Sequence, residues 1–117
     1  MQAHIVTAFK AARYAAGVSI TYRRGADEVT LSALPGSSSF TFVDDEKGIT
    51  SDEHHSEDFL ILASELVLAT VTVTPERFDE IDIDGRTLTA FDAPGVPHWD
   101  YADQYRAVIR VRCKGVE

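Results

Sequence analysis

The sequence predicts a mainly β fold: a small antiparallel β-sandwich or β-barrel with one N-terminal α-helix and a long acidic loop. Apolar and polar residues alternate in several short segments, as they do in strands with one buried face. Turn-forming residues recur about every 8–12 residues, which is typical of antiparallel β domains. Strands and helices do not alternate along the chain, as a parallel sheet would require. With 117 residues and 44% hydrophobic content, the chain has enough apolar material for one core, so we expect a single domain over 1–117.

The N-terminal helix is expected over residues 1–17. This segment is rich in alanine, and Ile5, Phe9 and Ala12 lie at helical spacing, with Gly17 as the predicted end. The apolar side of such a helix needs a surface to pack against, which belongs either to the same chain or to a neighbouring subunit. Phe9 is therefore a candidate for the core and also for a subunit interface.

Two strands joined by a turn are expected after this helix. Residues 18–23 and 29–33 alternate between apolar and polar side chains, and Gly25 marks the turn between them. Pro35 and the glycine after it interrupt the pattern, so we expect a separate third strand at 40–43.

Further strand signals occupy the second half of the chain. A continuous apolar run at 59–63 is typical of a strand covered on both faces, and 67–74 is rich in valine and threonine. The clearest hairpin lies at 81–91, where alternating apolar residues flank an Asp-Gly pair at 84–85. The last strand is expected over 105–114.

An acidic, polar segment at 44–58 contains Ile49 as its one large apolar residue. It cannot pack as core, so we expect an extended loop that faces a channel, a neighbouring subunit or only solvent. The candidate residues of this loop are Asp44, Asp45, Glu46, Asp52, Glu53, His54, His55, Glu57 and Asp58. Adjacent histidines on an extended chain point to opposite sides, so this pair does not make a metal-binding motif and no metal is predicted.

The charge and motif content disfavour several classes of function. The formal net charge is −8, the opposite of the basic surface that sequence-independent DNA binding requires. No nucleophile elbow, phosphate-binding glycine loop or zinc-protease helix is present, so we expect neither an enzyme nor a cofactor, and a metal-dependent hydrolase is the least favoured class. Asp79, Asp82 and Asp84 are not expected to form a catalytic pair, because Asp82 and Asp84 share one strand face and are interpreted as its solvated side, with Asp84 serving the turn. Cys113 is expected to be a buried thiol. Neither a secretion signal nor a membrane-spanning segment is evident, and we expect the protein to be cytoplasmic when made.

Two sets of side chains near the C-terminus are candidates for a subunit interface. Trp99 and Tyr101, in a loop region rich in proline and glycine, either anchor a partner or cover the core. Arg106, Arg110 and Arg112 have even spacing, which places them on one face of the expected last strand. This row either docks on a neighbour's acidic loop or is an ordinary charged strand face that discourages aggregation.

A proline-bounded segment from Pro75 to Leu88 carries the Asp-Gly hairpin, and a loop at 97–99 precedes a basic terminal strand. Together with the opening helix, the early hairpin and the acidic loop, this order of features resembles the head-tail joining proteins (stoppers, adaptors and head-tail connectors) of tailed bacteriophages and prophages. In that family a glycine is usual at the position that Phe78 occupies here.

The resemblance implies a structural virion protein of the phage neck that has no enzymatic activity. Such a protein forms a homo-oligomeric ring, of six subunits, with portal or adaptor proteins on the head side and a tail terminator or tail tube on the tail side. Double-stranded DNA passes through the ring without sequence-specific binding. The alternatives are a tail terminator or tail tube subunit or, in another class, a monomeric bacterial β domain that binds a protein or a small ligand.

Overall fold

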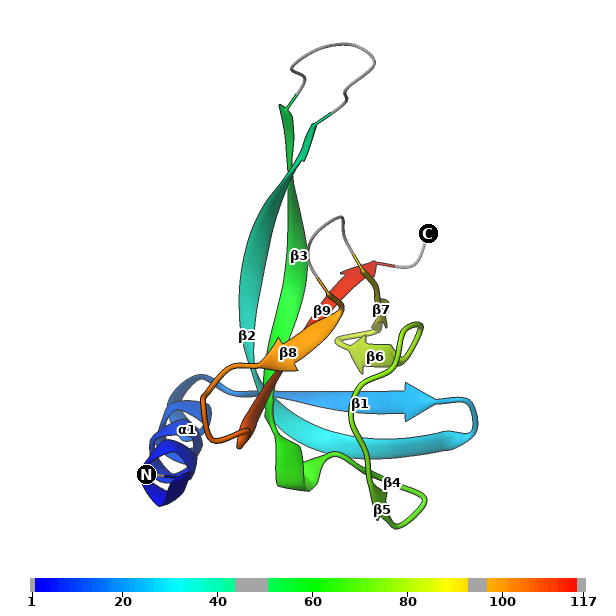
Figure 1. The fold of residues 1–117 in the computed structure, drawn as a ribbon. Coiled ribbons are helices and arrows are strands. Elements are labelled where there is room, and N and C mark those ends of the chain that lie inside the picture. The colour runs from blue at the N-terminus through cyan, green and yellow to red at the C-terminus, as the bar shows by residue number, and fades with distance from the viewer. Residues whose placement is uncertain (1, 44–50, 93–96, 116–117) are drawn as a thin grey trace.

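A computed structural model describes residues 2–43, 51–92 and 97–115 of the chain (Figure 1). Its elements are, in order, α1 (Gln2–Ala16), β1 (Val18–Arg24), β2 (Asp27–Val43), β3 (Ser51–Leu62), the short 3-10 helix η1 (Ala63–Glu65), β4 (Val67–Leu68), β5 (Val71–Thr72), β6 (Glu80–Ile83), β7 (Arg86–Ala90), β8 (Trp99–Tyr101) and β9 (Val108–Gly115). The predicted mainly β fold with an N-terminal helix is confirmed.

Six of the strands close into an antiparallel barrel. Hydrogen-bonded neighbours follow the order β3-β2-β1-β6-β7-β9, and β9 pairs again with β3, which closes the ring. On the side of β9 away from β3, β8 pairs with residues 109–111 and β7 pairs with residues 113–115. Of the two architectures expected, the barrel is therefore the one observed, and closure pairs the strand edges within the barrel wall.

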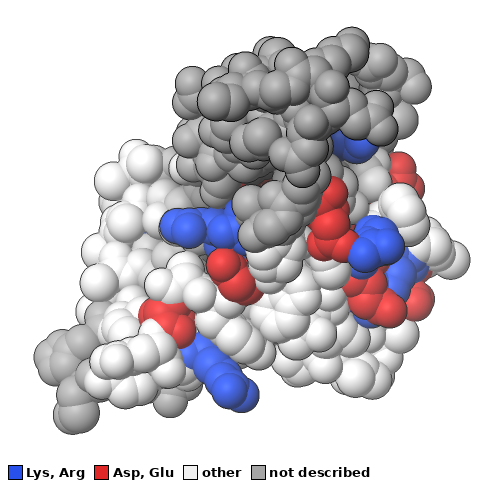
Figure 2. All heavy atoms as spheres, turned by 45° about the horizontal axis from the view of Figure 1, so that its top comes forward, with Lys and Arg blue, Asp and Glu red and all other residues white. Residues whose placement is uncertain are grey.

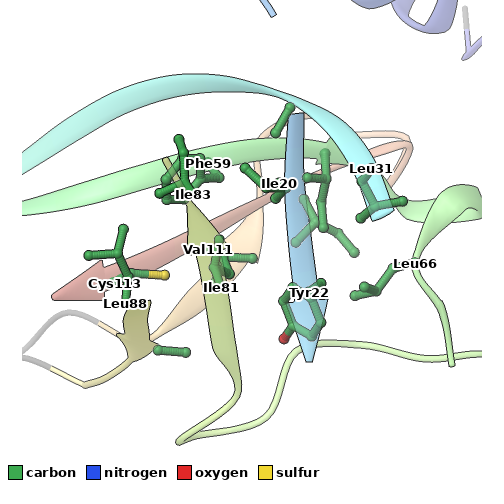
Figure 3. Close-up of a cluster of buried hydrophobic side chains, with 14 of the residues drawn as sticks. Ile20, Tyr22, Leu31, Phe59, Leu66, Ile81, Ile83, Leu88, Val111 and Cys113 are labelled. Carbon is green, nitrogen blue, oxygen red and sulfur yellow. The ribbon is translucent and has the colours of Figure 1, made fainter. Parts of the chain in front are cut away.

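Alternate residues of the strands fill the barrel interior. Ile20 and Tyr22 of β1, Ile81 of β6 and Leu88 of β7 are buried, while their sequence neighbours are half-buried or exposed. Figure 3 shows these side chains meeting those of β2, β3 and β9. The core cluster comprises Ile20, Tyr22, Leu31, Ala33, Phe59, Ile61, Leu66, Leu68, Ile81, Ile83, Leu88, Ala90, Ile109, Val111 and Cys113. The expected burial of the Cys113 thiol is confirmed.

The hairpin predicted around 84–85 is confirmed. β6 and β7 pair with Ile83 opposite Arg86, and Asp84 and Gly85 between them have φ angles of 49° and 78°. Positive φ at both central residues is the geometry of a type I′ turn, which an Asp-Gly pair favours. By contrast, the single strand expected over 67–74 is a small hairpin of β4 and β5.

β2 is longer than the sequence pattern indicated. A break at Pro35 and a separate strand at 40–43 were expected, whereas β2 runs without interruption from Asp27 to Val43. β1 pairs with β2 only as far as Ala33, so among the described strands β2 has an open edge from residue 34 onward. A proline, which has no N–H to donate, is tolerated in a strand with an open edge.

The expected acidic loop was wrong over its C-terminal half. Residues 51–58 belong to β3, which pairs with β2 from Ser51 opposite Val43 to Leu60 opposite Leu34. Polar residues suit this part of β3 because it pairs with β9 only from Glu57 onward, so the residues before it are outside the barrel wall. Residues 44–50 of the expected loop lie outside the described part of the chain.

α1 packs on the outer surface of the barrel. Phe9 is buried in a second apolar cluster with Leu62, Ala107 and Val108. The chain itself therefore supplies the surface that the helix needs, and Phe9 is a core contact and not an exposed interface residue.

Candidate assembly surfaces

β2 and β3 continue beyond the barrel as a two-stranded ribbon (Figure 1). We define the ribbon as residues 38–43 paired with 51–56, beyond Glu57, which is the last β3 residue that pairs with β9. At about 3.3 Å per residue, the ribbon extends about 20 Å. Among the described residues, neither outer edge of the ribbon has a strand partner. Isolated hairpins are only marginally stable and open edges accept further strands, so the ribbon is a candidate assembly surface.

The residues predicted to face a channel or a neighbour occupy different places. Outside the described part of the chain lie Asp44, Asp45 and Glu46. On the ribbon backbone lie Asp52, Glu53, His54 and His55. At the foot of the ribbon, Glu57 is exposed and accepts hydrogen bonds from Arg86 at 3.1 and 3.2 Å. Asp58 is only 2% exposed, with the Arg110 Nε atom 3.9 Å from its carboxylate, so it belongs to the barrel wall and not to a loop.

The expected row of three arginines is interrupted. β9 begins at Val108 and not at 105, so Arg106 lies in the turn before the strand, where its φ angle is 60°. Arg106 therefore does not share a strand face with the other two arginines. Arg112 is buried and donates to the Pro97 carbonyl oxygen at 3.1 Å and to the Asp100 carboxylate at 3.2 Å. It fixes the segment around β8 to the barrel, which leaves Arg110 as the half-exposed arginine of β9.

Trp99 and Tyr101 of β8 are half-buried and pack against the barrel core. Their rings meet edge to face, with centroids 5.1 Å apart and planes at 77°. The Arg106 guanidinium lies over the Tyr101 ring, 5.7 Å from its centroid. Both aromatic residues therefore cover the core and keep part of each ring at the surface, where a partner could also contact them.

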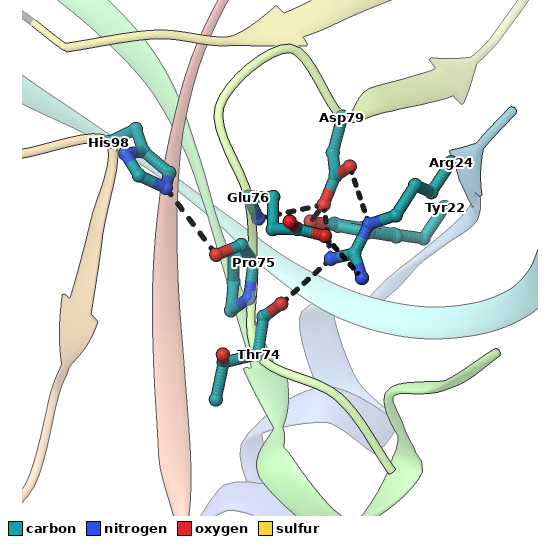
Figure 4. A network of polar contacts seen from close by, with 7 residues as sticks. All are labelled: Tyr22, Arg24, Thr74, Pro75, Glu76, Asp79 and His98. Carbon is teal, nitrogen blue, oxygen red and sulfur yellow. Dashed lines mark hydrogen bonds and ion pairs between the residues drawn. The ribbon is translucent and has the colours of Figure 1, made fainter. Parts of the chain in front are cut away.

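A buried polar cluster joins the end of β1 to the segment between β5 and β6 (Figure 4). Asp79 is 3% exposed and accepts hydrogen bonds from the Tyr22 hydroxyl and, at 2.9 and 2.8 Å, from the Arg24 guanidinium. Arg24 also donates to the Thr74 carbonyl oxygen at 2.8 Å, and the Glu76 N–H donates to Asp79 at 2.9 Å. A single carboxylate thus holds the whole segment 74–79 against the barrel.

The cluster shifts the pKa values of its members in the direction that preserves it. Burial, together with the hydrogen bond to Asp79, raises the pKa of Tyr22 above its ordinary value of 10.0, so the hydroxyl remains a donor. The hydrogen bond to Asp79 also raises the pKa of Arg24. Sequence reasoning missed this site because the partners of Asp79 lie 55 and 57 positions away along the chain.

Phe78 has an unusual backbone geometry. Its φ angle is 74°, in the left-handed region, where a non-glycine residue loses about 1–2 kcal/mol. Hydrogen bonds from the Phe78 N–H to Ala90 and from the Asp79 N–H to Glu76, at 3.0 and 3.1 Å, fix this conformation, and the ring is 73% exposed. Glycine adopts such a φ angle without strain, so a glycine is the residue expected at this position on backbone grounds.

The described part of the surface also contains an open pocket and a face with charges of both signs. An open pocket of about 490 Å³ beside the Asp79 cluster is lined by side chains that include Arg24, Thr72, Thr74, Glu76 and Tyr101. In the face shown in Figure 2, basic and acidic side chains lie next to one another and do not gather into patches of one sign.

Within the described ranges, no three His, Cys, Asp or Glu residues come together as a potential metal site. None of the described helices has the length and apolar character needed to cross a membrane.

The closed barrel, the ribbon and the mixed-charge surface define a small β-barrel protein whose candidate sites are surfaces for contact with other chains. The chain belongs to the phage head-tail joining protein family, whose model matches residues 1–117. This match confirms the resemblance seen in the sequence and gives the protein a structural role in the virion neck, where it contacts head and tail components. A comparison with curated proteins found no match.

Proposed function

We propose that this protein forms a ring of six subunits in the neck, between the portal or adaptor proteins and the tail, and that double-stranded DNA passes through the ring. The subunit acts as one domain, is made in the host cytoplasm and has no catalytic step of its own. The proposal rests on the family match over 1–117 together with the ribbon.

The ribbon is the observation that supports a ring most directly. It projects from the barrel and has no strand partner in the described part of the chain, so its edges are available to a neighbouring subunit or to the lumen of a ring. Its two strands lead into the acidic segment at 44–50. Acidic side chains around a channel repel the phosphates of DNA. They do not displace the counterions of the DNA, whose release drives its binding to basic surfaces, so the duplex can slide through the channel.

The barrel end of the ribbon supplies polar groups for contacts between subunits. Glu57 and Arg86 form an exposed ion pair at the ribbon foot, and Arg110 lies half-exposed beside the buried Asp58. We assign these groups, with the surface parts of Trp99 and Tyr101, to contacts around the ring.

Electron microscopy of particles assembled without the gene tests this function. We expect DNA-filled heads and separate, complete tails, and restoration of joined particles when the gene is supplied from a plasmid. Separate tails of irregular length would instead assign the chain to tail termination, because a terminator stops polymerisation of the tube. Normal virions would contradict any neck role. An averaged image of the neck of joined particles should show six copies.

A further inference from the structure

The surface around Phe78 forms an open socket of about 330 Å³. It is lined by Arg77, Phe78, Thr89, Phe91, Asp92 and Lys114. The Lys114 ammonium group lies over the Phe91 ring, 5.3 Å from its centroid, and Arg77 forms an ion pair with Asp92. Two phenyl rings, two cations and one carboxylate make this socket suited to an aromatic side chain that carries a hydroxyl.

Tyr14 is the most exposed large hydrophobic residue of the described chain. It lies on α1 with 95% of its surface accessible, although α1 buries Phe9 on the other side against the barrel. A tyrosine ring is electron-rich and interacts with cations at its face, while its hydroxyl donates to carboxylates. Tyr14 therefore has the chemistry that the socket selects.

Tyr14 and the socket lie at opposite ends of β1. Gly17 is the one residue between α1 and the first residue of β1, and its N–H donates to the Arg13 carbonyl oxygen at 2.7 Å. The last residue of β1, Arg24, holds the segment that contains Phe78 through Asp79. In Figure 1, α1 and the chain between β5 and β6 are accordingly on opposite sides of the barrel. Tyr14 cannot reach the socket of its own chain.

We propose that Tyr14 of one subunit occupies the Phe78 socket of the next subunit. Two different, complementary surfaces on opposite sides of one chain produce a head-to-tail contact, which closes into a ring when the rotation between neighbours divides a full turn. The occupant is a second copy of this chain, and the proposal rests on the ring proposed above, for which it names the contact between neighbours.

The backbone at Phe78 supplies an independent reason to assign this residue a binding role. Its left-handed φ angle is strained for phenylalanine, and its ring is exposed, so the ring contributes little to the core of its own chain. A glycine here would fold with less strain. Folding alone therefore does not account for an aromatic side chain at this position. A role as one wall of the socket that binds Tyr14 does account for it.

Complementation of particles that lack the gene tests the contact. We expect Phe78→Gly not to lower the Tm of the purified protein, because the strain that it removes offsets the larger conformational entropy of glycine in the unfolded chain. The same variant should reduce the yield of joined particles at least tenfold. Tyr14→Ala, which keeps a strong helix former on α1, should reduce joining to the same extent without lowering Tm. Val71→Ser removes another exposed hydrophobic side chain, outside the socket, and should join particles normally.

A photoreactive benzoylphenylalanine in place of Tyr14 identifies the neighbour directly. In joined particles it should link one copy of the chain to the segment 77–92 of another copy. A link to a different neck protein, or normal joining by both Tyr14→Ala and Phe78→Gly, overturns the contact while the ring itself stands. Normal virions in the complete absence of the gene overturn the ring and the contact together.

Discussion

The two halves of β3 show how differently one strand can be supported. From Glu57 to Leu62, β3 is paired with β9, and as far as Leu60 it is also paired with β2 on its other side; this part places Phe59 and Ile61 in the barrel core. From Ser51 to Ser56, the same strand is paired with β2 alone. The part from 57 to 62 is stabilised by strands of its own chain. The part from 51 to 56 can gain a further strand partner only from another chain.

This contrast separates residues that specify the fold from residues that are available for assembly. A closed barrel satisfies the backbone groups of its wall, so substitutions there act mainly on the free energy of unfolding. The ribbon contributes little to that free energy, because its two strands pair only with each other in the described part of the chain, and isolated two-stranded hairpins are marginally stable. Changes in the ribbon are therefore expected to act mainly on joining.

The largest loss of stability is expected from Asp79→Ala. The substitution leaves the buried Tyr22 hydroxyl and the half-buried Arg24 guanidinium without their carboxylate and releases the segment 74–79, at a cost of about 3–5 kcal/mol. Chemical denaturation measures this loss. Asp27→Ala, at an exposed position at the start of β2, is the control and should change the unfolding free energy by less than about 0.5 kcal/mol. Equal effects of the two variants would show that the Asp79 cluster is not a structural anchor.

A loss of about 2–4 kcal/mol is expected from Ile61→Ala in the supported half of β3. Ile61 is fully buried in the barrel core, so the shorter side chain loses apolar burial and leaves a cavity. The denaturant midpoint should fall while the slope of the transition is unchanged. A loss below about 1 kcal/mol would mean that the barrel interior is loosely packed and that the two halves of β3 differ less than proposed.

Removal of the ribbon should change stability by less than about 1 kcal/mol. Deleting 40–54 and connecting Ser39 to His55 through Asn-Gly uses a facing pair of residues and a turn that suits a two-residue hairpin. The shortened protein should unfold at nearly the same denaturant concentration as the full chain and should fail to restore joined particles. Efficient joining by this variant would remove the ribbon from the proposed ring.

The smallest effect is expected at Asp92, and it depends on pH. Hydrogen bonds from His98, with the Arg77 ion pair, lower the pKa of Asp92 from 3.8 to about 2. The stabilisation is therefore complete above about pH 4 and is lost as the pH falls toward 2. Because the carboxylate is partly exposed, the effect should be less than about 1 kcal/mol. Asp92→Asn should lower stability at pH 6 by this amount and flatten the dependence on pH between 4 and 2.

Local sequence patterns predicted the parts of the fold that depend on local chemistry. Alternation predicted β1 and the β6–β7 hairpin, and the Asp-Gly pair predicted the turn between β6 and β7 because positive φ angles favour these residues. The uninterrupted course of β2 through Pro35 could not be predicted, because it depends on where β1 stops pairing. The choice of a barrel over a sandwich likewise depends on the contact between β3 and β9, which are far apart in the sequence.

The candidate surfaces were predicted less well for the same physical reason. Asp58 and Arg112 were expected at exposed positions from their charge, but each lies in a barrel wall that supplies polar partners from distant segments. Phe78 was not among the predicted surfaces; in the sequence it stood out only as a departure from the glycine that the family resemblance led us to expect. The structure adds the φ angle, which turns that departure into a physical cost.

The burial of Cys113 has a practical consequence for redox chemistry. Its thiol lies inside the barrel, and burial raises its pKa, so the reactive thiolate is scarce and shielded from oxidants. The chain has no other cysteine. Folded subunits should therefore remain free of disulfide links during purification in air. A dye that reacts with thiols should label them only as the barrel opens, which makes the native cysteine a reporter of unfolding.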